Sequence, residues 1–105
     1  MSGKSVIVGY KLFIDDERQP PDESWLVVRS SNEAIEFVKK YGMPSFISFD
    51  HDLGGTDTTM VFLKQFYNFF DLLGQGPPEY TVHSANPIGA ENIKSFMESW
   101  KRSLK

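Results

Sequence analysis

The chain has 105 residues, of which 40% are hydrophobic and 24% charged, so it is long enough for one folded domain and too short for two of ordinary size. Its net charge of −3 excludes a general electrostatic attraction to DNA, which needs clustered Lys and Arg, although a nucleic-acid end can still be a substrate. The absence of cysteine excludes disulfides and thiolate metal sites, so any metal must be held by oxygen or imidazole.

The first predicted strand runs from Lys11 to Ile14, and Val6 to Val8 can extend it toward the N-terminus. This apolar run ends abruptly at the acidic pair Asp15 and Asp16, as expected where a buried strand leaves a sheet at its carboxyl end. Two consecutive prolines, Pro20-Pro21, follow shortly afterwards. Proline lacks the backbone N–H that a helix interior needs, so we expect an extended connection here.

A second strand is predicted at Trp25 to Arg29. Its direction stays open, because ten residues can just cross over to a parallel neighbour, whereas an antiparallel edge is also compatible with the sequence. Ser30 to Glu33 then match the capping box, in which the serine accepts from a backbone N–H and the glutamate reaches back to the serine. A helix up to Tyr41 follows, and Gly42 and Pro44 stop it.

The third predicted strand, Phe46 to Phe49, runs straight into Asp50-His51-Asp52 and then Gly54-Gly55. Three ionisable groups in succession at the end of a buried strand cost desolvation free energy unless something uses them. We therefore interpret this segment as functional.

The second predicted helix spans about Thr58 to Leu73, with Thr56 and Asp57 as candidate N-caps. It is rich in phenylalanine and apolar over most of its circumference. Such a helix is either sandwiched within the fold or covered by a partner, so we consider a homodimer formed through this Phe-rich helix.

The fourth strand is predicted at Tyr80 to Val82 and runs out into His83-Ser84-Ala85-Asn86, after which a last helix carries an apolar stripe from Ile93 to Leu104. Strands that alternate with helices indicate one small α/β domain with a mainly parallel four-stranded sheet, covered by three helices on both faces. In such sheets, ligands bind outside the carboxyl ends of the strands. All three polar clusters fall at that edge.

The acidic residues at this edge favour a divalent cation. Carboxylates a few ångströms apart in a partly dry site cannot all stay ionised without a cation or a shared proton. Oxygen ligands suit Mg²⁺, or Mn²⁺ in its place, and Mg²⁺ commonly completes its shell with water and substrate phosphate. We therefore predict a Mg²⁺ site at Asp15, Asp16 and Asp50, and a substrate that carries phosphate.

Two histidines add proton-transfer chemistry to these acids. Imidazole takes or gives a proton near neutral pH, so His51 and His83 are the candidate general base and acid across one phosphoester bond, with Asp50 as the third catalytic residue. Small polar side chains, and backbone N–H groups at the positive end of a helix, can hold phosphate oxygens. The candidate substrate-binding residues are Ser84, Asn86, Gly54 and Asp52.

Each of these residues also has a purely structural interpretation. A strand that ends in two aspartates often marks only a turn, and a loop histidine such as His51 commonly hydrogen-bonds a backbone carbonyl. Ser84 and Asn86 precede Pro87 and can equally form a turn. The sequence leaves these alternatives open.

The polar clusters follow the pattern of a known family. An acidic pair after the first strand (Asp15, Asp16), an aspartate after the third (Asp50) and a serine after the fourth (Ser84) resemble the receiver domains of two-component signalling. In those domains Mg²⁺ is bound among the acids and the aspartate is phosphorylated. The helix that normally follows the first strand, the fifth strand and a matching lysine have no counterpart in this sequence.

A closer resemblance, over nearly the whole chain, is to the cyclic-phosphate-processing receiver domains, a divergent receiver-like family. The segments that carry it are Leu12 to Asp16, Arg18, Pro20-Pro21, Trp25, Val28-Arg29, Ser48 to Gly54 and Val82 to Pro87. The resemblance implies a truncated receiver/flavodoxin-like fold, a single domain over residues 1–105 in which 1–10 form an N-terminal extension. It also implies action on cyclic phosphate ends of nucleotides or RNA, and a phage or bacterial origin.

Two functional hypotheses follow. The first is a metal-assisted phosphoesterase that acts on a cyclic or terminal phosphate of a nucleotide or RNA end, with an aspartyl-phosphate at Asp50 as the variant that the receiver resemblance suggests. The alternative is a non-catalytic receiver-like binding or regulatory module that associates through the Phe-rich helix. No segment approaches the ~20 apolar residues of a membrane span, and the N-terminal apolar run is too short for a secretory signal, so we expect a cytoplasmic protein.

Overall fold

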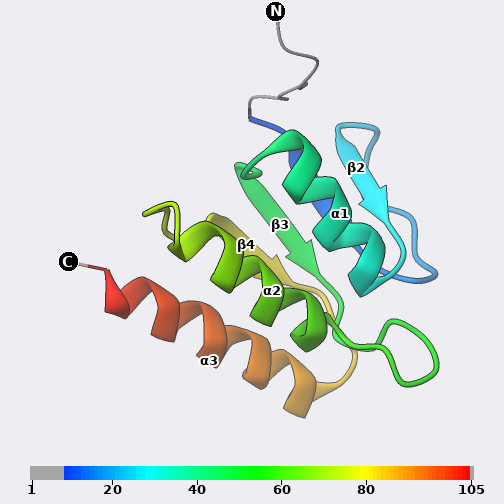
Figure 1. Cartoon of the computed structure of the whole chain (residues 1–105). Helices are drawn as coiled ribbons and strands as arrows, with labels where there is room; N and C mark the ends of the chain where they lie inside the picture. The colour runs from blue at the N-terminus through cyan, green and yellow to red at the C-terminus, as the bar shows by residue number, and fades with distance from the viewer. Residues whose placement is uncertain (1–8, 105) are drawn as a thin grey trace, which may run out of the picture.

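The computed structural model describes residues 9–104 and has the predicted elements in the predicted order (Figure 1). The expected extension of the first strand through Val6 to Val8 lies outside the described residues. The strands are β1 (Lys11–Ile14), β2 (Trp25–Val28), β3 (Phe46–Phe49) and β4 (Glu79–Val82). The helices are α1 (Ser31–Tyr41), α2 (Thr59–Asp71) and α3 (Pro87–Ser103).

The four strands form one sheet in the order β2-β1-β3-β4, and every neighbouring pair is parallel. This settles the direction of β2, which the sequence left open: Lys11 pairs with Trp25 and Ile14 with Val28 in parallel register. The connection from β1 to β2 is a loop without a helix, as the two prolines predict. The α/β fold class with a four-stranded sheet and three helices is therefore confirmed.

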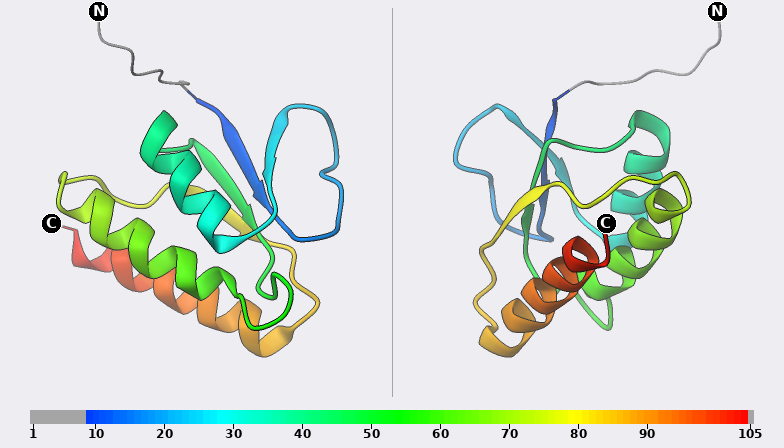
Figure 2. Two further views of the ribbon diagram at one scale, coloured as in Figure 1. Left: turned by 45° about the vertical axis from the view of Figure 1, so that its right-hand side comes forward. Right: turned by 90° about the vertical axis from the view of Figure 1, so that its left-hand side faces the viewer.

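The three helices cover only one face of the sheet, so the prediction of helices on both faces is wrong (Figure 2). Neighbouring helices contact each other in the order α1, α2, α3 and form a single layer. Alternate strand residues point to the same face, and Leu12, Ile14 and Phe49 join the helices in the hydrophobic core. The physical reason is the loop between β1 and β2, which replaces the crossover helix that would cover the second face.

The helix-free face carries a small group of aromatic side chains. Phe13 and Phe46 both meet the Trp25 ring edge to face, with ring centroids 5.9 Å apart in each pair. The Lys11 ammonium lies 4.5 Å from the centroid of the same tryptophan ring. Phe13 is only 4% exposed although it lies outside the core beneath the helices. The second face is thus covered by its own side chains and not by a helix.

The Phe-rich helix α2 is sandwiched within the fold. It contacts α1 on one side and α3 on the other, and Phe62, Phe66 and Phe70 are buried. Of the two arrangements that the sequence allows for this helix, the structure has the one in which α2 is sandwiched within the fold. None of the helices within residues 9–104 is both long enough and apolar enough to cross a membrane.

The start of α2 differs from the prediction. Its N-cap is Thr58, whose side chain makes no capping hydrogen bond, so the assignment of Thr56 and Asp57 as caps is wrong. The Asp57 carboxylate instead accepts hydrogen bonds from the backbone N–H (2.8 Å) and the hydroxyl (2.5 Å) of Ser31 in the first turn of α1. A carboxylate at the positive end of that helix is electrostatically favourable. Asp57 thereby ties the loop after β3 to α1.

Replacing Ser30 by alanine is expected to destabilise the protein by about 1 kcal/mol, the usual cost of losing an N-cap. The Ser30 hydroxyl accepts from the Glu33 backbone N–H as predicted (3.1 Å), whereas the Glu33 carboxylate reaches back to the N–H of Arg29 and not of Ser30. Urea denaturation measures the loss. Ser95→Ala, at an exposed position of α3, is the control, and equal unfolding midpoints for the two variants would contradict the capping role.

Candidate functional site

The register of the sheet brings the polar clusters to one edge. Ile14 is level with Phe49, and Phe49 with Val82, so the residues that follow these strands are also level. Backbone hydrogen bonds continue the ladder there: Asp50 donates to the carbonyl of Ile14 and His83 to that of Phe49, both at 2.9 Å. Asp15, Asp50 and His83 therefore stand side by side at the carboxyl ends of β1, β3 and β4.

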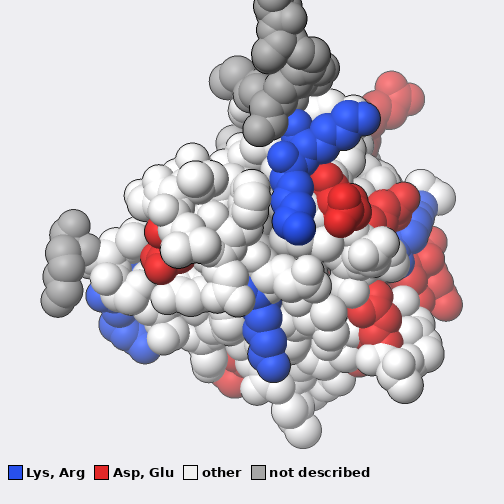
Figure 3. Space-filling view, in the orientation of Figure 1, with Lys and Arg blue, Asp and Glu red and all other residues white. Residues whose placement is uncertain are grey.

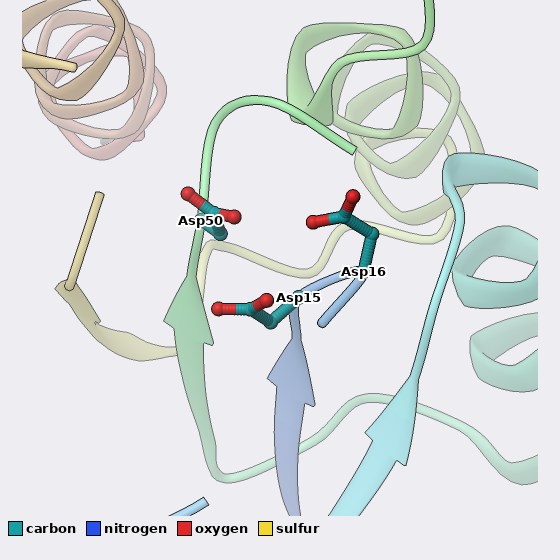
Figure 4. Close-up of side chains that lie close together, drawn as sticks. All are labelled: Asp15, Asp16 and Asp50. Atoms are coloured by element: carbon teal, nitrogen blue, oxygen red, sulfur yellow. The ribbon is translucent and has the colours of Figure 1, made fainter. Parts of the chain in front are cut away.

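Asp15, Asp16 and Asp50 form a compact cluster, and their carboxylates point into the same space (Figure 4). One oxygen from each lies within 4.8 Å of the others. The cluster borders an open cavity of about 410 Å³. The residues that line this cavity are Asp15, Asp16, Glu17, Arg18, Asp50, Asp52, Gly54, Gly55 and Ala85.

Asp15 is a buried carboxylate held at both oxygens. Burial raises the pKa of its carboxyl group, but hydrogen bonds outweigh this effect and hold the pKa below its ordinary value. The backbone N–H groups of Arg18 and Glu17 donate to Oδ1 at 2.8 and 2.9 Å, and His83 Nε2 lies 2.9 Å from Oδ2. Asp15 is therefore negatively charged and fixed in orientation.

Asp50 experiences the opposite balance. Its partial burial raises the pKa of the carboxyl group, and the negative charge of Asp15 raises it further. The backbone N–H of His51 donates to Asp50 Oδ1 at 2.9 Å but does not fully offset these effects. A nearby cation would thus stabilise the ionised form of Asp50.

His83 lies on the helix-free face with both ring nitrogens engaged. Nε2 meets Asp15 Oδ2, and Nδ1 lies 2.7 Å from the hydroxyl of Ser48, which is 4% exposed. The imidazole also stacks on the Phe13 ring, with centroids 4.6 Å apart and planes 4° from parallel. The ring is therefore held rigidly, and His83 is not among the residues that line the cavity.

His51 turns toward the start of α3. Its Nδ1 lies 3.0 Å from Asp52 Oδ1, and the amide of Asn86 donates to the other Asp52 oxygen at 3.3 Å. These two hydrogen bonds lower the pKa of Asp52, that from His51 more strongly. The network joins the loop after β3 to the loop after β4. It leaves the His51 ring outside the lining of the cavity.

The predicted substrate-binding residues fall into two groups. Gly54 and Asp52 line the cavity, and Gly54 has φ +95° with Asp16 Oδ2 3.4 Å from where its Cβ would lie, so a side chain is strained there. Ser84 and Asn86 stabilise local backbone, in addition to the hydrogen bond from Asn86 to Asp52. The Ser84 hydroxyl accepts from the N–H of Asn86, and the Asn86 side chain caps α3 by accepting from Gly89.

A family model described as the cyclic-phosphate processing receiver domain matches residues 10–99. The chain belongs to this family. The match covers all four strands, α1, α2 and most of α3, and the resemblance inferred from the sequence motifs is therefore confirmed. Searches of curated proteins and of solved structures found no match. The acidic cluster at the carboxyl ends of β1 and β3 thus belongs to a receiver domain of the cyclic-phosphate processing type.

Two supporting residues of this receiver domain lie in the segments that carry the family resemblance, but the sequence assigned them no role. Arg29 Nη1 donates to the carbonyls of Asp15 (3.1 Å) and Arg18 (2.7 Å) and so fixes the loop after β1. Ser48 positions His83 through the hydrogen bond already described. One signal was available for Ser48: it is the only polar residue within the buried strand Phe46–Phe49 and stands two positions before Asp50 on the same face.

Basic side chains do not form one large patch near the helices of this receiver domain. On the helix-covered face, Lys and Arg form small groups at separate places, with acidic side chains beside one of these groups (Figure 3). Nonspecific binding to nucleic acid needs such charges to be clustered. This face therefore lacks the electrostatic footprint of a general nucleic-acid binder, in agreement with the net charge of −3.

Proposed function

We propose that this receiver domain is a metal-assisted phosphoesterase that acts on a cyclic or terminal phosphate of a nucleotide or of an RNA end. The observation that carries the proposal is the cluster of Asp15, Asp16 and Asp50, whose oxygens lie within 4.8 Å of one another beside an open cavity. Membership in the cyclic-phosphate processing receiver family supports a phosphate-bearing substrate.

The residues of the cluster fit a hard divalent ion, Mg²⁺ or Mn²⁺. All three offer carboxylate oxygens, and the charge of Asp15 raises the pKa of Asp50, which indicates a repulsion that a cation would relieve. Asp15, Asp16 and Asp50 would hold the ion. When bound, it would polarise a phosphoryl oxygen and offset the charge that develops there.

The hydrolysis of a cyclic phosphodiester adds one water molecule. A new P–O bond forms, the ester bond from phosphorus to one ribose oxygen breaks, and that ribose oxygen takes up a proton. Asp50 is the candidate nucleophile in the covalent variant, because its carboxylate faces the cavity and, among residues 9–104, accepts a single hydrogen bond, from the N–H of His51. Attack of Asp50 would break the bond from phosphorus to one ribose oxygen, which takes up a proton, and would leave the nucleotide joined to Asp50 through phosphorus. Water would then break the bond between Asp50 and phosphorus, which releases the phosphate monoester and a proton and restores the carboxylate.

His51 and His83 remain the candidate general base and acid, and each must then release a hydrogen bond to act. His83 would release Asp15 or Ser48, and His51 would release Asp52. His51→Gln and His83→Gln test this role, because glutamine can keep one hydrogen bond but transfers no proton at neutral pH. A variant that retains the wild-type rate would limit that histidine to positioning its carboxylate.

The activity itself is tested on the full chain with a nucleoside 2′,3′-cyclic phosphate and Mg²⁺. We expect the ³¹P NMR signal of the cyclic diester to convert into that of a monoester, and we expect no conversion with EDTA or with Asp50→Asn. Asp71→Asn, at an exposed position near the end of α2, is the charge-matched control and should convert at the wild-type rate. Absence of conversion by the wild type would contradict the phosphoesterase proposal for this substrate.

The alternative, a binding module that associates through the Phe-rich helix, has less support. Phe62, Phe66 and Phe70 are buried in the core and are not available to a partner. Val61 is the large apolar residue that α2 itself exposes, and two further exposed leucines, Leu72 and Leu73, lie beyond the end of the helix. The geometry at the carboxyl ends of the strands is therefore the better guide to function.

A further inference from the structure

Arg18 is the one cationic side chain that lines the acidic cavity within residues 9–104. It lies on the loop after β1, and its Nη1 donates to the carbonyl oxygen of His83, 2.8 Å away, just after β4. Because β3 lies between β1 and β4, the side chain crosses the end of β3, where Asp50 stands. Its positive charge acts on Asp50 and opposes the effect of burial on the pKa of that carboxyl group.

The backbone of Arg18 is anchored on both sides. Its N–H donates to Asp15 Oδ1 at 2.8 Å, and its carbonyl accepts from Arg29 Nη1 at 2.7 Å. The side chain, in contrast, is exposed and makes one hydrogen bond among the described residues, so most of its five guanidinium N–H groups face no protein acceptor. A guanidinium group that is planar and largely free, on a backbone that is held in place, suits bidentate binding of phosphate.

The lining of the cavity is negatively charged, so a cationic side chain there would help an anion to bind. Three carboxylates that bind one divalent ion leave one negative charge, and Glu17 and Asp52 add two more on the lining. A phosphate anion that approaches this cavity is repelled unless a fixed positive charge meets it. Arg18 is the residue of the lining that supplies this charge.

We propose that Arg18 is the phosphate-binding residue of this site. Its Nε and Nη2 groups donate to two non-bridging oxygens of the substrate phosphate, while Nη1 keeps its hydrogen bond to His83. The assignment rests on the proposed function and identifies the group that the site recognises, which is the phosphate itself. In this proposal the carboxylates hold the metal and the guanidinium binds the phosphate, so substitutions at the two places should change metal affinity and phosphate affinity separately.

The test is a calorimetric titration of the full chain with two probes, Mg²⁺ alone and inorganic phosphate, the latter with and without Mg²⁺. For Arg18→Gln we expect phosphate affinity to fall roughly tenfold or more, as for the loss of hydrogen bonds to a charged group. Mg²⁺ affinity should stay unchanged or become tighter, because a like charge is removed from the site. Arg18→Lys keeps the positive charge but loses the planar guanidinium, so its phosphate affinity should lie between those of Arg18→Gln and the wild type.

Arg102→Gln, an identical charge change at an exposed position near the end of α3, is the control and should bind both probes as the wild type does. Unfolding curves establish that Arg18→Gln remains folded without its bond to His83. Phosphate affinity equal in Arg18→Gln and wild type would overturn the assignment, whether or not Mg²⁺ binds. Failure of the wild type to bind Mg²⁺, with phosphate binding still lost in Arg18→Gln, would instead overturn the metal-assisted function and leave Arg18 in its role.

Discussion

Replacing Asp50 by asparagine is expected to abolish Mg²⁺ binding and, in metal-free buffer at neutral pH, to make the protein more stable against unfolding. The side chain keeps its size but loses the charge that Asp15 repels and that burial disfavours. Because Asp50 is a proposed direct ligand, its loss should reduce Mg²⁺ affinity by more than the roughly 10- to 100-fold typical of losing a residue that only orients a ligand. Calorimetry with Mg²⁺ measures the first effect, and urea denaturation in EDTA measures the second.

The stability gain from Asp50→Asn should depend on pH in a defined direction. The pKa of Asp50 in the folded protein is raised above its ordinary value of 3.8, so protonation favours the folded state. Wild-type stability from this group therefore increases as the pH falls from neutral through the folded pKa toward 3.8, and the difference between variant and wild type narrows over that window. Asp71→Asn controls for net charge. A difference that widens toward acid pH would contradict the assigned repulsion between Asp15 and Asp50.

The acidic cluster could be predicted from the sequence because it depends on sheet register alone. In parallel strands that start and end at the same level, the residues directly after each strand meet at one edge. The abrupt change from apolar to acidic residues at Ile14-Asp15 and Phe49-Asp50 marks this level in both central strands. Asp16 could be placed in the cluster because it directly follows Asp15 in the sequence. No knowledge of side-chain packing was needed to bring these three carboxylates together.

Side-chain directions beyond the strand ends could not be predicted in this way. Whether His51 and His83 point into the cavity depends on which groups lie nearby in the fold. His83 bonds Ser48, and the His51 ring, bonded to its neighbour Asp52, packs against Gly89 at the start of α3. Asp57 shows the same limit. Its sequence position fits an N-cap of α2, yet it binds Ser31 of α1, a partner that only the tertiary fold brings near.

The uncovered face of the sheet has a related cause. Alternation of strands and helices predicts an α/β sheet, but the sides on which helices lie depend on which strands each crossover joins. All three helices lie on the same face of this sheet (Figure 2). The connection that could place a helix on the other face is the proline-containing loop after β1. The two prolines predicted that a loop joins β1 to β2. That this loop leaves one face of the sheet without a helix could be inferred only once the strand order was known.

Replacing Gly89 by alanine is expected to destabilise the protein by about 1–3 kcal/mol, the usual cost of overpacking a filled site. Gly89 is buried in the first turn of α3, and a Cβ there would lie 2.4 Å from His51 Cγ and 2.8 Å from His51 Cβ. Rotation of the ring alone cannot relieve the clash, because His51 Cβ is also too close to the added methyl group. The histidine would have to leave Asp52, which loosens the loop after β3. Urea denaturation measures the loss of stability.

Gly76→Ala supplies a matched control for the Gly89 variant. Its Cβ would lie 2.3 Å from Leu104 Cδ1, which is even closer, but that contact is the far end of a leucine that is 42% exposed and can rotate away. We expect little loss of stability there. Combining Gly89→Ala with His51→Ala should remove most of the penalty, since the clashing ring is gone, and the double-mutant cycle measures this coupling. Additive effects of the two substitutions would mean that contact with His51 is not the reason position 89 requires glycine.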